Sequence, residues 1–142
     1  MGLIEIHDLY KIYNEGLESE VRALDGVSLS IDYGEFVAIV GSSGSGKSTM
    51  MNILGCLDIP TLGEYILDDI PITHRTEREL SDIRSRKISF IFQGYNLIPS
   101  LSVWQNVALP MTYQGVPAGE RQHRAMDALD AVGISAKAMS RP

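Results

Sequence analysis

The stretch that decides the fold is residues 36–49, which read Phe36-Val37-Ala38-Ile39-Val40-Gly41-Ser42-Ser43-Gly44-Ser45-Gly46-Lys47-Ser48-Thr49. Its first five residues are apolar without alternation, which is typical of a strand covered on both faces. The next eight fit G-x-x-x-x-G-K-[ST], the pattern of a phosphate-binding loop. A helical pattern then runs from Ser48 to about Leu57. Strand, loop and helix in this order are the context that the motif requires.

Each part of this loop matches a task in holding the phosphates of a nucleotide. Glycines let successive backbone N–H groups point inward at phosphate oxygens. The helix that follows adds its unpaired N–H groups and the positive end of its dipole. In such loops the lysine, here Lys47, reaches the β- and γ-phosphates, and the hydroxyl of Ser48 completes the shell of a Mg²⁺ ion. The sequence therefore predicts nucleotide binding by Gly41, Ser42, Ser43, Gly44, Ser45, Gly46, Lys47, Ser48 and Thr49.

The segments on either side of the loop predict an antiparallel layer. Alternating apolar residues indicate half-buried strands from Ile4 to Tyr13 and over residues 27–31, joined by a polar loop at residues 14–20. The stretch 64–69 ends in two aspartates and could be read as a Mg²⁺-binding strand. A tight Pro/Gly turn separates it from the preceding helix, which is too short for a parallel crossover. We interpret it as an antiparallel strand paired with the same layer.

Helical signals dominate the rest of the chain. Thr76 and Glu79 form a capping box before a short helix with Leu80 and Ile83 facing inward. Residues 88–92 predict a second buried strand. Beyond it, helices are predicted over residues 103–111 and from Pro117, the latter ending near Gly133 with one apolar face made by Ala125, Met126, Leu129 and Val132.

These patterns together predict an α/β fold. It consists of a partial P-loop NTPase core with an N-terminal antiparallel β layer and the start of an α-helical subdomain. The β layer and core occupy residues 1–100, and the helical part occupies residues 101–142.

Composition narrows the class of protein. The chain has 142 residues, a net charge of −6 and one cysteine, Cys56, so it forms no internal disulfide and a reducing compartment is the simpler expectation. The negative charge argues against a nucleic-acid partner. Residues 1–70 contain 12 acidic and 3 basic residues, whereas residues 71–142 contain 6 and 9. Two interpretations remain open: solvated basic helices, or a surface that meets an acidic partner.

Three stretches carry a resemblance to a known family. They are residues 40–68, which include Met51-Asn52-Ile53-Leu54-Gly55-Cys56-Leu57-Asp58, then Ile91-Phe92-Gln93-Gly94-Tyr95-Asn96-Leu97-Ile98-Pro99 and Asn106-Val107-Ala108-Leu109-Pro110. In this order they resemble the ATP-binding subunit of an ABC transporter, most closely the macrolide-export and lipoprotein-release subfamily. The resemblance extends over essentially the whole chain. Gly94, Leu62 and Asp69 depart from the family's usual residues, and none is expected to touch phosphate.

The resemblance implies roles for two further residues. Gln93 falls at the glutamine-loop position, where the amide joins the Mg²⁺ shell or orients the attacking water. Gln93 and Lys47 are then the catalytic residues of this chain, and Ser48 and Gln93 hold the metal. Tyr13 falls where the family places an aromatic ring that stacks on adenine. An aromatic side chain that simply packs at a strand end is the alternative for Tyr13.

The resemblance also implies cofactors, partners and a location. ATP and Mg²⁺ are the expected cofactors. A homodimer of the full-length ATPase is expected to hydrolyse ATP and power an integral-membrane permease, contacted through residues 93–101. The location implied is cytoplasmic, peripheral on the inner face of the cell membrane. In this family the membrane subunits select the substrate, so export and lipoprotein release are both compatible with the sequence.

The family's L-S-G-G-Q signature, Mg²⁺-binding aspartate, catalytic glutamate and switch histidine do not occur in these 142 residues. The expectation is therefore the N-terminal part of one nucleotide-binding domain, which cannot hydrolyse ATP in isolation and exposes an aggregation-prone sheet edge. One alternative is a truncated nucleotide-binding module without catalysis. Another is a different phosphate-loop enzyme such as a small-molecule kinase. A GTPase is disfavoured because the sequence has no Asn-Lys pair for an N-K-x-D motif.

Overall fold

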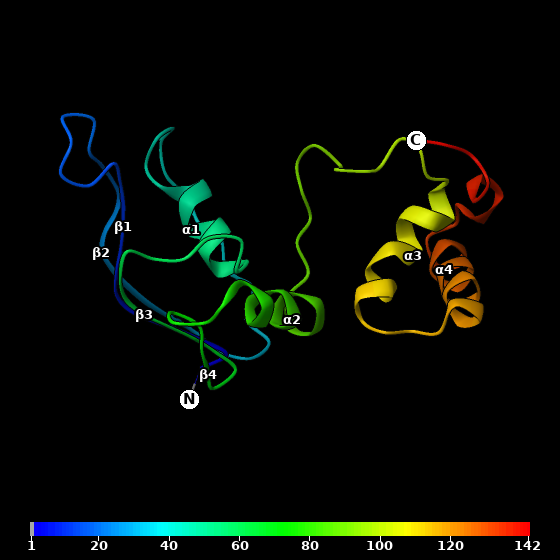
Figure 1. Cartoon of the computed structure of the whole chain (residues 1–142), viewed down its shortest axis with the longest axis horizontal. Helices are drawn as coiled ribbons and strands as arrows, with labels where there is room; N and C mark the ends of the chain where they lie inside the picture. The colour runs from blue at the N-terminus through cyan, green and yellow to red at the C-terminus, as the bar shows by residue number, and fades with distance from the viewer. Residues whose placement is uncertain (1) are drawn as a thin grey trace. The chain divides into compact units, whose positions relative to one another are not determined.

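A computed structural model describes residues 2–142 and divides the chain into two compact units. One unit runs to Arg84, and the other runs from Ser85 to Pro142. Figure 1 labels the helices and strands of each unit. The first contains an antiparallel sheet with the phosphate-loop helix. The second is mainly helical.

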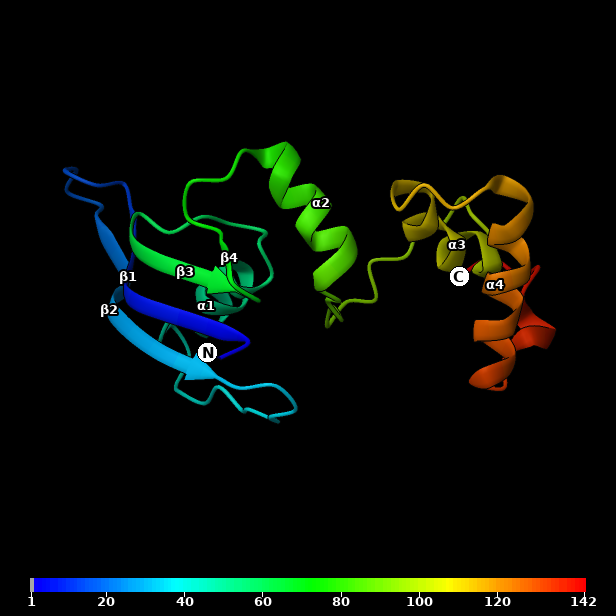
Figure 2. The ribbon, with the colours of Figure 1, turned by 90° about the horizontal axis from the view of Figure 1, so that it is seen from below.

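The first unit is built on a four-stranded antiparallel sheet. Its strands are β1 (Ile4–Tyr13), β2 (Val21–Ile31), β3 (Leu62–Leu67) and β4 (Ile70–Pro71), in the order β2-β1-β3-β4. Figure 2 shows β1 in the middle, with β2 on one side and β3 on the other. The loop between β1 and β2 covers residues 14–20, as the sequence predicts. The predicted antiparallel layer is thereby confirmed.

The sheet and helix α1 (Lys47–Leu54) share the core of this unit. Ile6 and Leu9 of β1, Tyr65 of β3 and Ile53 of α1 are each at most 1% exposed. Helix α1 is shorter than the predicted span to about Leu57. It ends because Gly55 caps it and Cys56 adopts a left-handed φ of 52°.

The aspartates after β3 lie in a tight turn rather than at the end of a parallel strand. Asp68 and Asp69 have φ angles of 49° and 61°, and they join β3 to β4 as a hairpin. Asp and Asn tolerate this left-handed conformation better than most residues. The hydroxyl of Tyr33 donates a hydrogen bond to the Asp68 carboxylate. The antiparallel interpretation of residues 64–69 is therefore confirmed.

Helix α2 (Glu77–Lys87) begins at the predicted capping box. The Thr76 backbone N–H donates to Glu79 Oε2 at 2.8 Å, and the Glu79 N–H donates back to the Thr76 hydroxyl at 3.4 Å. These bonds satisfy N–H groups that a helix start leaves without partners. Leu80 and Ile83 are buried, as predicted.

Two predicted strands are absent from the structure, and this corrects the sequence analysis. Residues 36–40 and 88–92 are not strands, and Phe36 and Ile91 are 98% and 95% exposed. A strand persists only where another strand satisfies its backbone N–H and C=O groups. The two segments fall in different units, and within residues 2–142 no strand of its own unit pairs with either one. Both segments are apolar, but neither has a strand partner within its own unit among the described residues.

The second unit is a helical hairpin made of α3 (Val103–Tyr113) and α4 (Ala118–Ala131), followed by the 3₁₀ turn η1 (Ser135–Lys137). Ser102 and Gln105 form a capping box at the start of α3. The Asn106 amide ties down the segment before α3, accepting from the Ile98 N–H at 2.8 Å and donating to the Ser102 carbonyl at 3.0 Å.

The apolar face predicted for α4 is confirmed in part. Ala125 and Leu129 are buried, but Val132 is 69% exposed because the helix ends at Ala131. Gly133 follows with a φ of 74°, in agreement with the predicted stop.

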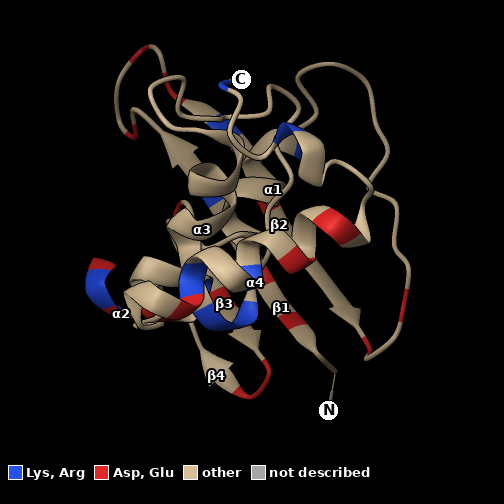
Figure 3. Ribbon diagram, turned by 90° about the vertical axis from the view of Figure 1, so that its right-hand side faces the viewer, with Lys and Arg blue, Asp and Glu red and all other residues tan. Residues whose placement is uncertain are grey.

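Charges on the helices pair locally. Arg84 contacts Glu77 at 2.7 Å and Arg75 contacts Glu79 at 2.9 Å. Figure 3 shows basic and acidic positions interspersed on α2. On α4, Arg124 contacts Glu120 at 2.5 Å. These pairs favour the interpretation of residues 71–142 as solvated charged helices.

Candidate functional site

The phosphate loop leads directly into α1, and two of its glycines are bent into the left-handed region. Gly44 has a φ of 78°, and Gly46, the residue just before α1, has a φ of 88°. At Gly46 a Cβ atom would lie 2.3 Å from the backbone oxygen of Ala23, which is on β2. No larger residue fits there without moving the backbone. The spacing of the motif thus follows from the close approach of the loop to the sheet.

The Lys47 ammonium folds back over the loop. It donates hydrogen bonds to the backbone oxygens of Gly41 at 2.7 Å and Ser42 at 2.5 Å, and its distance to the Ser45 hydroxyl is 3.4 Å. The side chain is half-buried. A cation therefore sits in the bend of the loop, where it can move from carbonyl oxygens to the oxygens of an incoming phosphate.

The start of α1 is suited to an anion. Its first turn contains no acidic residue, and no side chain caps it. The first N–H groups of a helix have no partner within the helix, and the dipole makes this end positive. Ser48 is exposed beside Lys47. Phosphate oxygens can accept hydrogen bonds from the backbone N–H groups and from the Lys47 ammonium. The Ser48 hydroxyl can coordinate Mg²⁺, so the residues present fit the predicted ligands.

The base of the loop rests against β2. A cavity of about 250 Å³ lies there, lined by the apolar side chains Leu24, Val27, Leu29, Ile39, Val40 and Met50 together with Gly41, Ser45, Gly46 and Lys47. The carboxyl-terminal end of segment 36–40 therefore lines the same cavity as β2 even though it forms no strand.

The far end of α1 is anchored by three polar contacts. The Tyr65 hydroxyl donates to the Leu54 carbonyl at 2.9 Å, and Arg84 donates to the Cys56 carbonyl at 2.5 Å. Lys11 holds Asp58 at 2.7 Å, just beyond the helix. Carbonyls at the end of a helix lack intrahelical partners, and side-chain donors satisfy them here.

Cys56 belongs to this anchored end. Burial raises the pKa of its thiol to about 11. The thiol is completely buried and stays protonated at neutral pH. Cys56 is therefore a packing residue.

Tyr13, the predicted adenine-stacking residue, is the last residue of β1 and is 40% exposed. The Lys11 ammonium lies 5.2 Å from the ring centroid, and the Tyr13 hydroxyl donates to Asp58 at 3.3 Å. Tyr13 and the phosphate loop belong to the same compact unit. An exposed aromatic ring held at its edge can offer a face to a planar base. Its contact with adenine stays a prediction.

Gln93 lies in the second unit, in an exposed turn after segment 88–92. The phosphate loop belongs to the first unit, so the roles of Gln93 toward Mg²⁺ and water stay predictions. Nearby Tyr95 and Asn96 have φ angles of 58° and 49°. The predicted permease-contacting stretch 93–101 begins in this irregular segment.

Sequence analysis missed two residues beside Tyr13. Lys11 and Asp58 had no assigned role, and no local motif singles them out. One signal was available: Lys11 lies two residues before Tyr13, so the two project from the same face of β1. Its pairing with Asp58 joins residues 47 positions apart, which only the folded chain reveals.

Neither a metal cluster nor a membrane helix occurs among residues 2–142. No group of three or more His, Cys, Asp or Glu side chains is placed to hold an ion there. The helices of this described part are all too short or too polar to cross a bilayer. His7, His74 and His123 are exposed.

Comparison with known proteins decides the family. The family model described as ABC transporter matches residues 24–142, which include the phosphate loop and Gln93. The chain belongs to the ABC transporter family. The resemblance stated from the sequence is confirmed.

Relatives of several kinds share this ABC sequence. An uncharacterized ABC transporter ATP-binding protein from Thermotoga maritima is 48% identical over 140 residues, which is 99% of this chain and 59% of that protein. The macrolide export ATP-binding/permease protein MacB of Aggregatibacter actinomycetemcomitans is 48% identical over all of this chain and 22% of its own length. The pyoverdine export protein PvdT of Pseudomonas aeruginosa is 49% identical over 99% of this chain and 21% of its own.

Solved ABC cassettes have the same fold. A dimeric ATP-binding cassette in a post-hydrolysis state, bound to ADP and Pi, matches with a TM-score of 0.87 and 43% identity over 98% of this chain and 61% of that cassette. A further dimeric structure of a bacterial ABC transporter cassette matches equally well. The α/β fold class is thereby confirmed. The chain spans about three fifths of the solved cassettes and of the Thermotoga relative.

Proposed function

We propose that this chain binds Mg·ATP at the phosphate loop as part of an ABC transport ATPase. The observation that carries the proposal is the cation-bearing bend before α1. The half-buried Lys47 ammonium, held 2.7 Å from the Gly41 carbonyl, lies at a helix start without acidic residues. This arrangement is complementary to the oxygens of a polyphosphate.

Each residue then has a defined task. Residues 41–49 surround the β- and γ-phosphates with N–H groups, and Lys47 exchanges its two loop carbonyls for phosphate oxygens. Ser48 supplies a hydroxyl to the Mg²⁺ shell, and Gln93 supplies an amide oxygen to that shell or to the attacking water. Tyr13 stacks on adenine. Mg²⁺ neutralises charge that develops on the transferring phosphoryl group, and the protein contributes positioning.

The biological reaction we propose is ATP hydrolysis that powers a membrane permease. Two copies of the whole ATPase close on ATP, as a dimer, and residues 93–101 contact the permease at the inner face of the membrane. Dimeric solved cassettes and the ATP-binding/permease names of the relatives support this proposal. Two processes remain as alternatives that ATP hydrolysis would power. One is export of a small molecule, as in the names of MacB and PvdT, and the other is release of a lipoprotein.

Calorimetric titration of the 142-residue chain with Mg·ATP tests nucleotide binding. Lys47→Ala should weaken binding at least about tenfold, because a charge-assisted contact to phosphate is lost. Lys137→Ala removes an exposed ammonium in η1, away from the phosphate loop in the sequence, and serves as the control; it should leave the affinity unchanged. Equal affinities of the Lys47→Ala variant and the parent chain would refute the proposed site.

Turnover is tested separately by phosphate release. We propose that the 142 residues bind ATP without sustained hydrolysis, because opposing groups of a dimer complete an ABC site. Steady release of phosphate that disappears in Lys47→Ala would contradict this part of the proposal and leave the binding site standing.

A further inference from the structure

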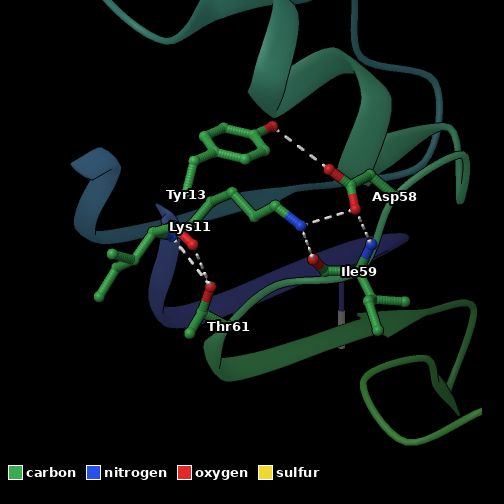
Figure 4. Close-up of polar contacts among 6 residues, drawn as sticks. Lys11, Tyr13, Asp58, Ile59 and Thr61 are labelled. Carbon is green, nitrogen blue, oxygen red and sulfur yellow. Dashed lines mark hydrogen bonds and ion pairs between the residues drawn. The ribbon is translucent and has the colours of Figure 1, made fainter. Parts of the chain in front are cut away.

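A cluster at the end of β1 holds Tyr13 from two directions. The Lys11 ammonium contacts Asp58 Oδ1 at 2.7 Å and the Ile59 carbonyl at 2.8 Å. The Lys11 and Asp58 side chains are only 13% and 28% exposed. Figure 4 shows the Lys11 stem running along one side of the Tyr13 ring toward Asp58. This ion pair is better shielded from water than a typical surface pair.

The same carboxylate reaches the edge of the ring. Asp58 Oδ2 accepts a hydrogen bond from the Tyr13 hydroxyl at 3.3 Å, while the ammonium lies 5.2 Å from the ring centroid. One edge and one side of the ring are therefore occupied by protein. The ring is still 40% exposed, so part of its surface is open.

The backbone around Tyr13 is fixed by the same turn. The Ile12 N–H donates to the Thr61 hydroxyl at 2.9 Å, and the Thr61 N–H donates to the Tyr10 carbonyl at 2.7 Å. Figure 4 shows Thr61 below Lys11, with hydrogen bonds to the backbone of β1. The turn that follows α1 thus fixes the β1 backbone just before Tyr13, and its Asp58 side chain contacts the Tyr13 hydroxyl.

We propose that Lys11 and Asp58 are positioning residues that pre-orient the Tyr13 ring for stacking on adenine. The inference rests on the proposed function, since it requires Tyr13 to contact the base. Immobilising a side chain before binding removes part of the entropy cost that ligand binding otherwise pays. The cluster also connects the base-binding residue to α1, whose other end carries the phosphate loop.

Charge on Asp58 is maintained in this setting. Partial burial raises the pKa of its carboxyl, but hydrogen bonds from Lys11 and from the Ile59 N–H outweigh burial, so the pKa lies below its usual value. The carboxylate is therefore ionised at neutral pH.

The test compares two probes on the 142-residue chain: Mg·ATP, and Mg·tripolyphosphate, which has no base. Tyr13→Ala should weaken ATP about tenfold, the loss expected when a base loses its aromatic partner. Asp58→Asn should weaken ATP about threefold. Both variants should bind tripolyphosphate as the parent chain does. Asp25→Asn, which removes the charge of an ion-paired carboxylate on β2, is the control and should change neither affinity.

A double variant separates positioning from a general structural role. If Asp58 acts through the ring, then Tyr13→Ala with Asp58→Asn binds ATP no more weakly than Tyr13→Ala alone. Full additivity of the two losses, an equal loss for ATP and tripolyphosphate, or no loss in Asp58→Asn would each overturn the proposal.

Milder variants keep the test decisive if Asp58→Asn unfolds. Tyr13→Phe retains the ring and deletes only the 3.3 Å contact, and should weaken ATP about twofold with tripolyphosphate unchanged. Lys11→Arg keeps the positive charge that pairs with Asp58 and should bind ATP as the parent chain does. Lys11→Met removes that charge and should bind ATP more weakly. Equal affinities of Lys11→Arg and Lys11→Met would overturn the proposal.

Failure of this inference can be told apart from failure of the proposed function. If Tyr13→Ala has no effect on ATP affinity while Lys47→Ala weakens it, this inference fails and the phosphate site stands. If Lys47→Ala has no effect on ATP affinity, the proposed function fails first.

Discussion

The two ends of α1 are built in opposite ways. At the carboxyl-terminal end, Tyr65 and Arg84 donate hydrogen bonds to the Leu54 and Cys56 carbonyls, and the region is buried. At the amino-terminal end no side chain caps the helix, and Lys47 bonds only to its own loop. One end is satisfied by the protein. The other end keeps donors that a ligand can use.

This difference explains how a short helix can serve as a binding device. Helix α1 has 8 residues and would be unstable alone. Anchoring its far end to β3 and α2 keeps the open end in place without using the groups that face the ligand. Variants that disturb only the open end or only the anchored end should therefore differ in their effects, and the largest effect is expected at the open end.

Gly46→Ala should break the open end. The added Cβ would lie 2.3 Å from the Ala23 oxygen at a φ of 88°, so the loop must move and we expect a loss of about 2–4 kcal/mol in the free energy of unfolding. ATP binding should be lost with it. Urea denaturation and calorimetry measure the two effects.

Gly44→Ala is the matched control for that change. Gly44 has a φ of 78° but no neighbouring atom within 4 Å of a new Cβ, so only backbone strain of about 1 kcal/mol is expected. Equal destabilisation by the two variants would show that the contact with Ala23 has no special role.

Tyr65→Phe should loosen the anchored end. It deletes the 2.9 Å hydrogen bond to the Leu54 carbonyl in a residue that is 1% exposed, and we expect a loss of about 1–2 kcal/mol. Alkylation of Cys56 at pH 8 should become faster, because local opening exposes a thiol that is otherwise buried and protonated. An unchanged alkylation rate would mean that Tyr65 does not hold this end.

Glu79→Gln should have the smallest effect and a distinctive pH dependence. Hydrogen bonds from the Thr76 backbone N–H and hydroxyl, and then from Arg75, lower the pKa of Glu79 to about 2 from an ordinary value of 4.5. A lowered carboxylate pKa means that this stabilisation is present above the ordinary value and is lost as pH falls toward 2. The parent chain should therefore lose more stability than Glu79→Gln between pH 5 and pH 2.5.

Urea midpoints measured across that pH range make the comparison. The variant weakens the cap of α2, and α2 supplies Arg84 to the anchored end of α1. Parallel pH profiles for the parent chain and Glu79→Gln would contradict the role of this cap.

Local signals in the sequence predicted much of the fold. The capping box at Thr76, the loop at residues 14–20 and the helix stop near Gly133 depend on neighbours within a few residues, and all three are present. The strands predicted at residues 36–40 and 88–92 depend on distant partners that periodicity cannot supply, and they are absent.

The candidate site divides in the same way. The phosphate loop was predictable because its spacing encodes its own geometry, including the glycine that must approach Ala23. Lys11 and Asp58 were not predictable, since their 2.7 Å contact bridges two distant segments. Gln93 was assigned from the family resemblance, and its geometry in the site stays a prediction.

The most direct test of the contrast between the two ends is a two-dimensional ¹H–¹⁵N NMR titration of the 142-residue chain with Mg·ATP. The account predicts large shifts for the amides of residues 44–49 and little change at residues 53–56, because the ligand replaces only the partners of the open end. Shifts concentrated at residues 53–56, or no shifts in the loop at saturating ATP, would contradict it.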